Sequence, residues 1–359
     1  MPNLISTQAP CLFLHSFWRS GSTALFNAFL SVPGFLCYYE PLHEGLARLT
    51  PAKARSHDSA SAQAMGHYAL STPYFSEYEP MVVGRRGVAH YPAELAYGEF
   101  FLLTEEGEAG LRRYFLALAR HAWSQGRIPV FCLNRSWGRI AAIKALMPGA
   151  LHIYSLRQAH LTIGSILARK SYFGAKLLQI FDLAQPEMMQ AIYPALRPSL
   201  TKRFRTEHFY KRVACGAAPE ALAPLVALAH GLSMVNGLAH ADYVLDLSER
   251  AHFRDDRQFL VDRVANFMGQ EAARRLRDAL LALPELNPHC QDVSAPSPAL
   301  PERIHLRGLL DAPLGSVMVR ADKRARKLGP SIRSDWQHIV DGWYPQLEHT
   351  RRETMQADD

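Results

Sequence analysis

The stretch Leu12–Glu40, LFLHSFWRSGSTALFNAFLSVPGFLCYYE, constrains the fold of this chain more than any other segment. It opens with a short apolar run typical of a buried strand and continues into a small polar turn, Arg19–Thr23. After the turn, Ala24–Leu30 carries apolar side chains at helical spacing. The pattern predicts a strand, a loop and a helix, in that order.

The turn Arg19–Thr23 (RSGST) has the chemistry of an anion site. The first N–H groups of a helix lack intrahelical partners, and the helix dipole favours negative charge there. Ser20, Ser22 and Thr23 add hydroxyl donors, and Arg19 adds a guanidinium suited to phosphate or sulfate. A plain strand-to-helix turn with serines as helix caps is the competing interpretation. The P-loop pattern GxxxxGK[ST] is incomplete, since its first Gly and its Lys are missing, and this disfavours a conventional ATPase.

Composition indicates a globular protein and leaves the ligand open. A chain of 359 residues can form one large domain or two, and its net charge of +7 suits a polyanionic small ligand as well as nucleic acid. Five scattered cysteines without any CxxC predict neither a zinc site nor a disulfide framework, and they favour a reducing compartment. Residues 1–10 lack the features of a secretory signal, and the apolar stretch 221–238 is interrupted by polar residues. We therefore expect a cytoplasmic protein without stable membrane insertion.

Apolar runs alternate with helical patterns along most of the chain. After the first strand, further strands are predicted at Phe35–Tyr39, Ile128–Leu133, Leu151–Leu156 and Tyr243–Leu247. Strands that are apolar on both faces and alternate with helices predict an α/β fold with a central, mostly parallel sheet covered on both sides.

Polar side chains follow three of these strands. In open α/β sheets ligands bind at the carboxyl ends of the strands, so these side chains are expected to face one crevice. Arg157 follows the strand Leu151–Leu156, and Ser165 comes eight residues later on the next helix. This pair predicts a second anion site beside Arg19–Thr23, and two such sites suggest a nucleotide with phosphates at both ends. Glu40, after the second strand, is a candidate base, and the alternative is a Glu paired with a neighbouring Arg.

At these residues the sequence resembles the PAPS-dependent sulfotransferases. Arg19–Thr23 matches their 5′-phosphosulfate loop [K/R]SG[ST][ST], and Arg157 and Ser165 match their 3′-phosphate site. Residues 153–165 (IYSLRQAHLTIGS) are similar to the family's strand–RDP–helix, with Gln158-Ala159 in place of Asp-Pro. DYVLDL at 242–247 and NFMG at the end of 259–269 resemble two later family segments, so the similarity covers residue 11 to about residue 270. The Arg in the first loop and the Glu after the second strand are typical of the carbohydrate and protein-tyrosine branches.

The resemblance implies a P-loop-like three-layer fold in a single domain, 1–359. Residues 45–127, rich in aromatics, would form an acceptor-side insertion, and the loop and basic helical tail 284–359 would complete the nucleotide site. Glu40 would be the general base, with His43, His121 and His160 as surrogates, and Arg19 would stabilise developing charge. The residues implied to hold PAPS are Arg19, Ser20, Gly21, Ser22, Thr23, Ala24, Arg157, Ser165 and Arg333.

The implied reaction moves the sulfuryl group of PAPS to a hydroxyl or amine of a saccharide, a peptide tyrosine or a small metabolite. It releases adenosine 3′,5′-bisphosphate (PAP) and is expected to need no metal. A P-loop-like, ATP-dependent small-molecule kinase is the first alternative, but it needs a Walker-type Lys and a metal-holding Asp that the sequence does not place. A basic nucleic-acid-binding protein is the second, but the basic residues cluster in the tail, away from the aromatics, so nucleic acid is not an expected partner.

Overall fold

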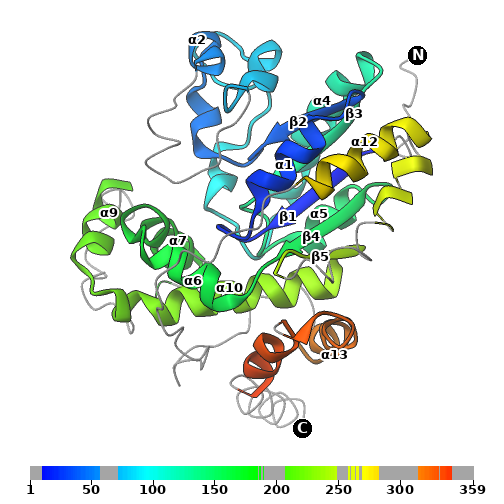
Figure 1. The fold of residues 1–359 in the computed structure, drawn as a ribbon. Helices are drawn as coiled ribbons and strands as arrows, with labels where there is room; N and C mark the ends of the chain where they lie inside the picture. Colours follow the sequence, from blue (N-terminus) through cyan, green and yellow to red (C-terminus); the bar gives the residue numbers. More distant parts are fainter. Residues whose placement is uncertain are drawn as a thin grey trace, which may run out of the picture.

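The computed structural model describes residues 10–56, 72–184, 186, 189, 207–248, 258, 260–262, 264–266, 269–282, 314–330 and 332–341. Within them, five parallel strands form one sheet in the order β2-β3-β1-β4-β5 (Figure 1). The α/β class and the central sheet are therefore confirmed, and the described sheet is wholly parallel. The strands are β1 (Leu12–Ser16), β2 (Phe35–Tyr39), β3 (Ile128–Leu133), β4 (Leu151–Leu156) and β5 (Tyr243–Asp246).

Strand β1 lies at the centre of the sheet, between β3 and β4. Leu12 is in register with Val130 on one side and with Leu151 on the other. All five residues of β1 are buried. A parallel sheet that is covered on both faces needs apolar side chains in both directions, which explains the continuous apolar runs in the sequence.

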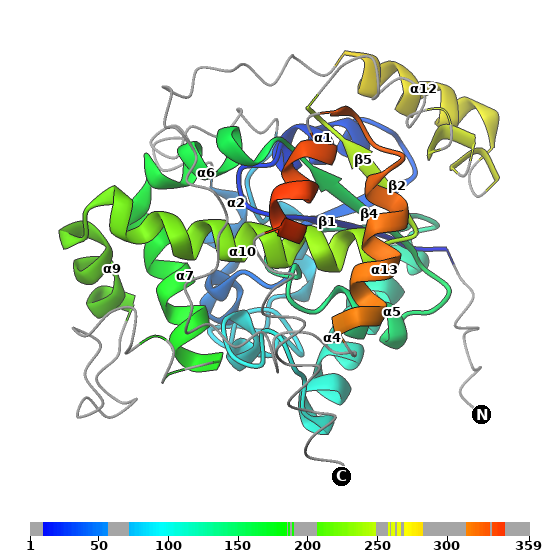
Figure 2. The same cartoon turned by 90° about the horizontal axis from the view of Figure 1, so that it is seen from below.

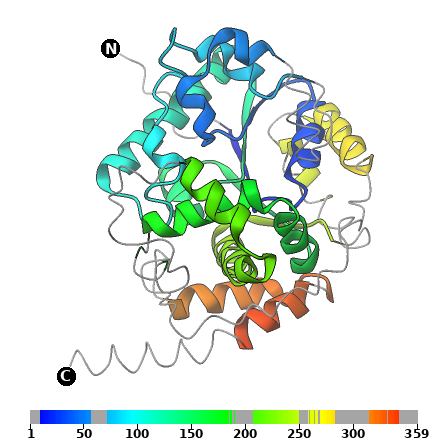
Figure 3. The same cartoon turned by 90° about the vertical axis from the view of Figure 1, so that its left-hand side faces the viewer.

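Helices cover both faces of the sheet (Figure 3). On one face, α1 (Ser22–Leu30) and α12 (Gln270–Leu281) share a core with alternate strand residues such as Leu14 and Cys37. On the opposite face lie α4 (Glu105–Ser124), α5 (Ile140–Leu146) and α10 (Pro219–His240). The structure is thus compatible with the expected three layers of helix, sheet and helix.

The other helices extend the α10 side of the molecule. α6 (Ala159–Leu167) and α7 (Lys170–Ala184) pack against α10, and α9 (Glu207–Gly216) packs against α7. α13 (Leu314–Ala325) lies on the outer side of α10 (Figure 2). By length and composition, residues 221–240 of α10 could cross a membrane, but this stretch is largely buried against the rest of the protein.

Segment 45–127 packs into the main core. Its described residues contain α2 (Pro51–Arg55), α4 and three 3₁₀ helices, of which the first begins one residue before the segment. Its aromatic side chain Tyr78 is buried beside Tyr38 of β2. The 3₁₀ helices are η1 (Glu44–Arg48), η2 (Ser76–Met81) and η3 (Ala93–Ala96). Residues 57–71 of this segment, and residues 283–313 and 342–359 around the expected tail, lie outside the described part of the chain.

Candidate functional site

The loop after β1 leaves the N-terminus of α1 without a side-chain cap. Gly21 is the residue before the helix, its φ is +93°, and no side chain accepts a hydrogen bond there. Ser20 Oγ instead donates to the carbonyl of Phe17 at 2.7 Å. Within the described residues, no backbone–backbone hydrogen bond uses the N–H of Gly21 or of Ser22. The serine-cap interpretation of this turn is therefore wrong, and the loop retains N–H donors at the positive end of the helix.

The two predicted anion sites lie next to each other. Because β4 is hydrogen-bonded to β1, their carboxyl ends are adjacent, and Arg157 leaves the sheet beside the first loop. Arg19 Nε donates to Ser165 Oγ on α6 at 2.8 Å. Arg157 and Ser165 are both buried, with 9% and 3% of their surface exposed. The structure thus brings Arg19, Arg157 and Ser165 to one place on the sheet edge.

Three other residues assigned to the nucleotide site differ in their surroundings. Thr23 Oγ1 lies 2.7 Å from the hydroxyl of Tyr39, and the N–H of Ala24 already donates to the carbonyl of Gly21 at 3.1 Å. Arg333 is exposed on the helix at 332–341. That helix is anchored at the start of α6, since Asp335 Oδ2 accepts from the N–H of Ala159 at 2.8 Å. Arg333 is therefore on an element beside the Arg157 exit, but no described contact joins it to the loop.

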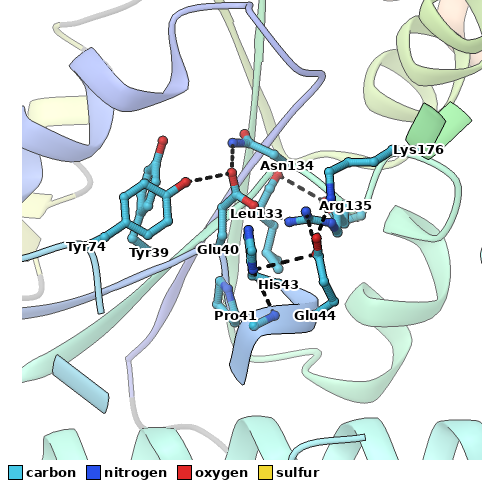
Figure 4. Close-up of polar contacts among 12 residues, drawn as sticks. Tyr39, Glu40, Pro41, His43, Glu44, Tyr74, Leu133, Asn134, Arg135 and Lys176 are labelled. Atoms are coloured by element: carbon cyan, nitrogen blue, oxygen red, sulfur yellow. Dashed lines mark hydrogen bonds and ion pairs between the residues drawn. The ribbon is translucent and has the colours of Figure 1, made fainter. Parts of the chain in front are cut away.

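Glu40 leaves β2 in a left-handed backbone conformation, with φ of +44°. Its Oε1 accepts from Tyr74 at 3.1 Å and from the amide of Asn134 at 3.0 Å, and its Oε2 accepts from Arg135 Nη1 (Figure 4). Asn134 and Arg135 directly follow β3, the strand beside β2. Glu40 is therefore paired with an Arg, as the alternative interpretation expected, and that Arg is Arg135.

Arg135 also belongs to a larger buried charge cluster. Its Nη2 donates to Glu44 Oε2 at 2.8 Å, while Glu44 Oε1 accepts from Lys176 on α7. Lys176 Nζ also donates to Tyr97 at 2.6 Å. Two carboxylates and two cations thus alternate at the carboxyl ends of β2 and β3, with no net charge.

Burial and neighbouring charges shift the pKa values in this cluster. Burial raises the pKa of Glu40, but the Arg135 guanidinium, together with His43 and Asn134, lowers it to about 2. Burial likewise raises the pKa of Glu44, and Arg135, His43 and Lys176 bring it well below its usual value. Burial and Arg135 lower the pKa of Lys176 to about 8, with Glu44 opposing them. Glu40 is therefore ionised and Lys176 is the group that titrates nearest neutrality.

The three histidines considered as surrogate bases have other roles or positions. His43 Nδ1 accepts from the N–H of Gly45 at 3.0 Å and so caps η1, and burial and Arg135 lower its pKa to about 4. His121 contacts Gln125 at 2.9 Å on the surface of α4. His160 is exposed at the start of α6. Of the three, His43 alone faces the Glu40 cluster.

Sequence reasoning did not assign Asn134, Arg135 or Lys176 to the site. Asn134 and Arg135 directly follow an apolar strand, which is the same signal that identified Glu40 and Arg157. Lys176 is a single cation within an apolar helical stretch, SYFGAKLLQIF, and such a residue needs a buried partner. The aromatic-rich segment also supplies Tyr74 and Tyr97, while most of its other rings pack in the cores.

The arrangement joins an anion-binding edge to a buried carboxylate. Arg19, Arg157, Ser165 and the α1 N-terminus offer donors to phosphate or sulfate oxygens, and Glu40 offers an acceptor for a hydroxyl proton. Thr23, Tyr39 and Tyr74 lie between the two parts, since Tyr39 contacts the rings or hydroxyls of both others. Comparisons with family models, with curated proteins and with solved structures find no match to this chain.

Proposed function

We propose that this chain is a PAPS-dependent sulfotransferase with a P-loop-like fold. The observation that carries the proposal is the contact between Arg19 and Ser165, which joins the loop after β1 to the site after β4. The motif resemblance requires these two sites to hold the two ends of one nucleotide. The strand order is consistent with this, because β1 and β3 send their connections in opposite directions, and ligands of open α/β sheets bind at such a switch point.

The loop would bind the 5′-phosphosulfate end of PAPS, and the β4 exit the 3′-phosphate. The N–H groups of Gly21 and Ser22 and the hydroxyls of Ser22 and Thr23 would donate to the 5′-phosphate. Arg157 and Ser165 would hold the 3′-phosphate. Arg333 would approach the same phosphate from the helix that Asp335 anchors at α6.

The reaction would be an in-line transfer. The acceptor oxygen or nitrogen forms a bond to sulfur while the bond from sulfur to the bridging oxygen of PAPS breaks; the electron pair of that bond stays on the 5′-phosphate of PAP, and the acceptor releases one proton. Arg19 would stabilise negative charge on the bridging oxygen. Positioning and charge stabilisation would provide most of the rate enhancement, as in phosphoryl transfer.

Glu40 Oε2 would receive the acceptor proton. An ionised carboxylate accepts hydrogen bonds at about four positions. Tyr74, Asn134 and Arg135 use three of them, and the remaining one is on Oε2. A pKa of about 2 makes Glu40 a weak base. In a loose transition state the acceptor has formed little of its new bond, so a weak base suffices to orient the hydroxyl and take the proton late.

The kinase alternative fits the site less well. Its Walker-type Lys is absent, since Ser22 follows Gly21 where the pattern has Lys. The strands that flank β1 are followed by Asn134 and Arg157, which are not carboxylates able to hold Mg²⁺. The sulfotransferase reading uses both residues, Arg157 as a phosphate ligand and Asn134 as a donor to Glu40.

Ligand-induced thermal shifts test this proposal. We expect PAP to raise the melting temperature of the wild type more than ATP with Mg²⁺ or an oligonucleotide does. ATP has no 3′-phosphate, and the phosphates inside an oligonucleotide are diesters with less charge than the terminal phosphates of PAP. Arg157→Ala and Ser165→Ala should each reduce the PAP shift. Arg113→Ala on the exposed side of α4 should retain it. If both site variants keep the full PAP shift, the assignment of the 3′-phosphate is wrong, and a larger shift with ATP and Mg²⁺ would favour the kinase.

A further inference from the structure

Four charged side chains form a line that ends at Glu40. Lys176 binds Glu44 Oε1, Glu44 Oε2 accepts from Arg135 Nη2, and Arg135 Nη1 binds Glu40 Oε2 (Figure 4). They come from four separate places in the chain: α7, η1, the end of β3 and the end of β2. Lys176 and Arg135 are 2% and 1% exposed. Glu40 is buried as well, whereas the Glu44 side chain is 27% exposed. Water therefore screens the pair between Arg135 and Glu40 least, and a change at Lys176 reaches Glu40 through Glu44 and Arg135.

The guanidinium of Arg135 is shared between two carboxylates. It gives one N–H to Glu40 and one to Glu44, and Glu44 satisfies its second oxygen with Lys176. Without Lys176, Glu44 has a free oxygen and can accept both N–H groups of Arg135 in a bidentate pair. The ion pair between Arg135 and Glu40 would then weaken.

We propose that Lys176 is a positioning residue that controls, through Glu44 and Arg135, how strongly Glu40 binds a proton. This proposal rests on the proposed function, in which Glu40 accepts the acceptor proton. While Lys176 keeps Glu44 occupied, Arg135 stays on Glu40, and Glu40 remains ionised and ready to accept. When Lys176 no longer binds Glu44, Arg135 moves away from Glu40, so Glu40 becomes more basic and its carboxylate loses its fixed orientation.

Other groups surround both ends of the line. Lys176 is also faced by Tyr97, by the ring of Tyr172 at 4.4 Å and by the charge of Glu207 on α9. None of these three groups is a cation that could take the place of Lys176 beside Glu44 Oε1. Among the described residues, the titratable or charged groups that interact with Glu40 are Arg135, His43, Glu44, Tyr39, Tyr74, Tyr78, Cys132 and Tyr172.

A carboxyl titration tests the proposal without any substrate. The full chain, labelled with ¹³C at the Glu carboxyls, is titrated by NMR from about pH 1 to about pH 6, a range that includes the wild-type Glu40 pKa of about 2. The Glu40 signal is identified by its absence in Glu40→Gln. We expect Lys176→Met to raise the pKa of Glu40 by about one unit or more, because one cation leaves the cluster and Arg135 shifts to Glu44. Lys176→Arg keeps the charge and should leave the titration near that of the wild type. Lys170→Met, at the start of the same helix and bonded to the carbonyl of Ala217, is the matched control.

Glu44→Gln provides the opposite change. It removes the competing carboxylate, so Arg135 serves Glu40 alone and the Glu40 signal should show no upward shift. If Lys176→Met folds and its Glu40 titration equals that of the wild type, Lys176 does not control Glu40 and the proposal is wrong. Should Lys176→Met fail to fold, Lys176→Leu also removes the donor to Glu44 and is judged by the same criterion.

A second readout separates this proposal from the proposed function. In a sulfate-transfer assay, Lys176→Met should change kcat while the PAP thermal shift stays that of the wild type, because Lys176 does not contact the loop or the β4 exit in the described residues. If Lys176→Met raises the Glu40 pKa as expected but the wild type does not bind PAP, the sulfotransferase proposal is wrong while the control of Glu40 by Lys176 stands. If the wild type shows the expected PAP thermal shift but Lys176→Met leaves the Glu40 pKa unchanged, the sulfotransferase proposal stands and the control of Glu40 by Lys176 is wrong.

Discussion

Replacement of Arg135 by Met tests the charge cluster most directly, because this residue neutralises two carboxylates, the buried Glu40 and the partly exposed Glu44. The pKa of Glu40 falls from 4.5 to about 2 in the folded protein. At 1.36 kcal/mol per unit, this corresponds to about 3 kcal/mol of stability at pH 7. Breaking a buried ion pair on one side costs about 3 to 5 kcal/mol, since the remaining charge is left without compensation. We therefore expect Arg135→Met to lower the free energy of unfolding by about 3 to 5 kcal/mol at pH 7.

The pH dependence of this loss follows from the direction of the pKa shift. In the wild type the folded-state pKa of Glu40 is lowered, so its contribution is complete above about pH 4.5 and is lost as the pH falls toward 2. In Arg135→Met, burial dominates and raises the folded-state pKa of Glu40 above its unfolded value. Protonation then stabilises the variant, and this gain is lost as the pH rises. The difference between variant and wild type should shrink by about 1 kcal/mol or more from pH 7 to pH 5.

Urea denaturation at pH 7 and at pH 5 measures both effects. Arg139→Met is the matched control, since Arg139 is equally buried but donates to backbone carbonyls and takes part in no ion pair within the described residues. Its loss should not depend on pH over this range. Addition of Glu40→Gln to Arg135→Met removes one uncompensated carboxylate and should recover part of the loss. A loss below about 1 kcal/mol at pH 7, or one that does not shrink at pH 5, would refute the reasoning.

Two further predictions concern the base and a buried histidine pair. Glu40→Gln should lower sulfate transfer from labelled PAPS into an extract of the source cells by about a hundred- to ten-thousand-fold, with the PAP thermal shift retained; near-normal transfer would place the base elsewhere. His15 and His152 are 3.0 Å apart and buried, and burial lowers both pKa values, that of His152 to about 4. Both stay neutral when folded, so stability is complete above about pH 6.5 and falls as the pH approaches 4. His152→Leu should lose less stability than the wild type between pH 7 and pH 5 in urea denaturation, and equal losses would contradict this account.

The elements of the fold could be read from the sequence, but their order in the sheet could not. The strand, loop and helix at Leu12–Leu30 follow from local apolar spacing, and the structure has β1 and α1 there. The position of Arg157 beside the first loop depends on β4 pairing with β1, which are separated by more than a hundred residues. Local patterns carry no information on such pairing. The sequence placed Arg157 beside that loop only through the general rule that ligands of open α/β sheets bind at the carboxyl ends of the strands, and the family resemblance matched the same two motifs.

The partners of Glu40 illustrate the same limit at the level of side chains. Local sequence indicated a Glu at a strand end and left open whether it is a base or half of an ion pair. The answer depends on Arg135, 95 residues away, and on Lys176. Both could have been noted as charges next to or inside apolar stretches. Their convergence on Glu44 follows only from the packing of α7 and η1 against the end of the sheet.

The loop residue Arg19 and the carboxylate residue Glu40 both have a left-handed backbone conformation. Arg19 and Glu40 have φ of +65° and +44°, and they follow β1 and β2 respectively. A residue other than Gly in this region costs of the order of 1 to 3 kcal/mol, and such residues concentrate at functional sites. Gly at either position would relieve that strain but would remove a side chain that makes a specific contact, Arg19 to Ser165 and Glu40 to Arg135. His90 and Glu99 have the same left-handed backbone outside this site, so a positive φ alone does not mark a functional residue. Arg19 and Glu40 differ from them because each follows a strand of the sheet and directs its side chain to a buried partner, and the sulfuryl-transfer proposal gives a reason for both directions.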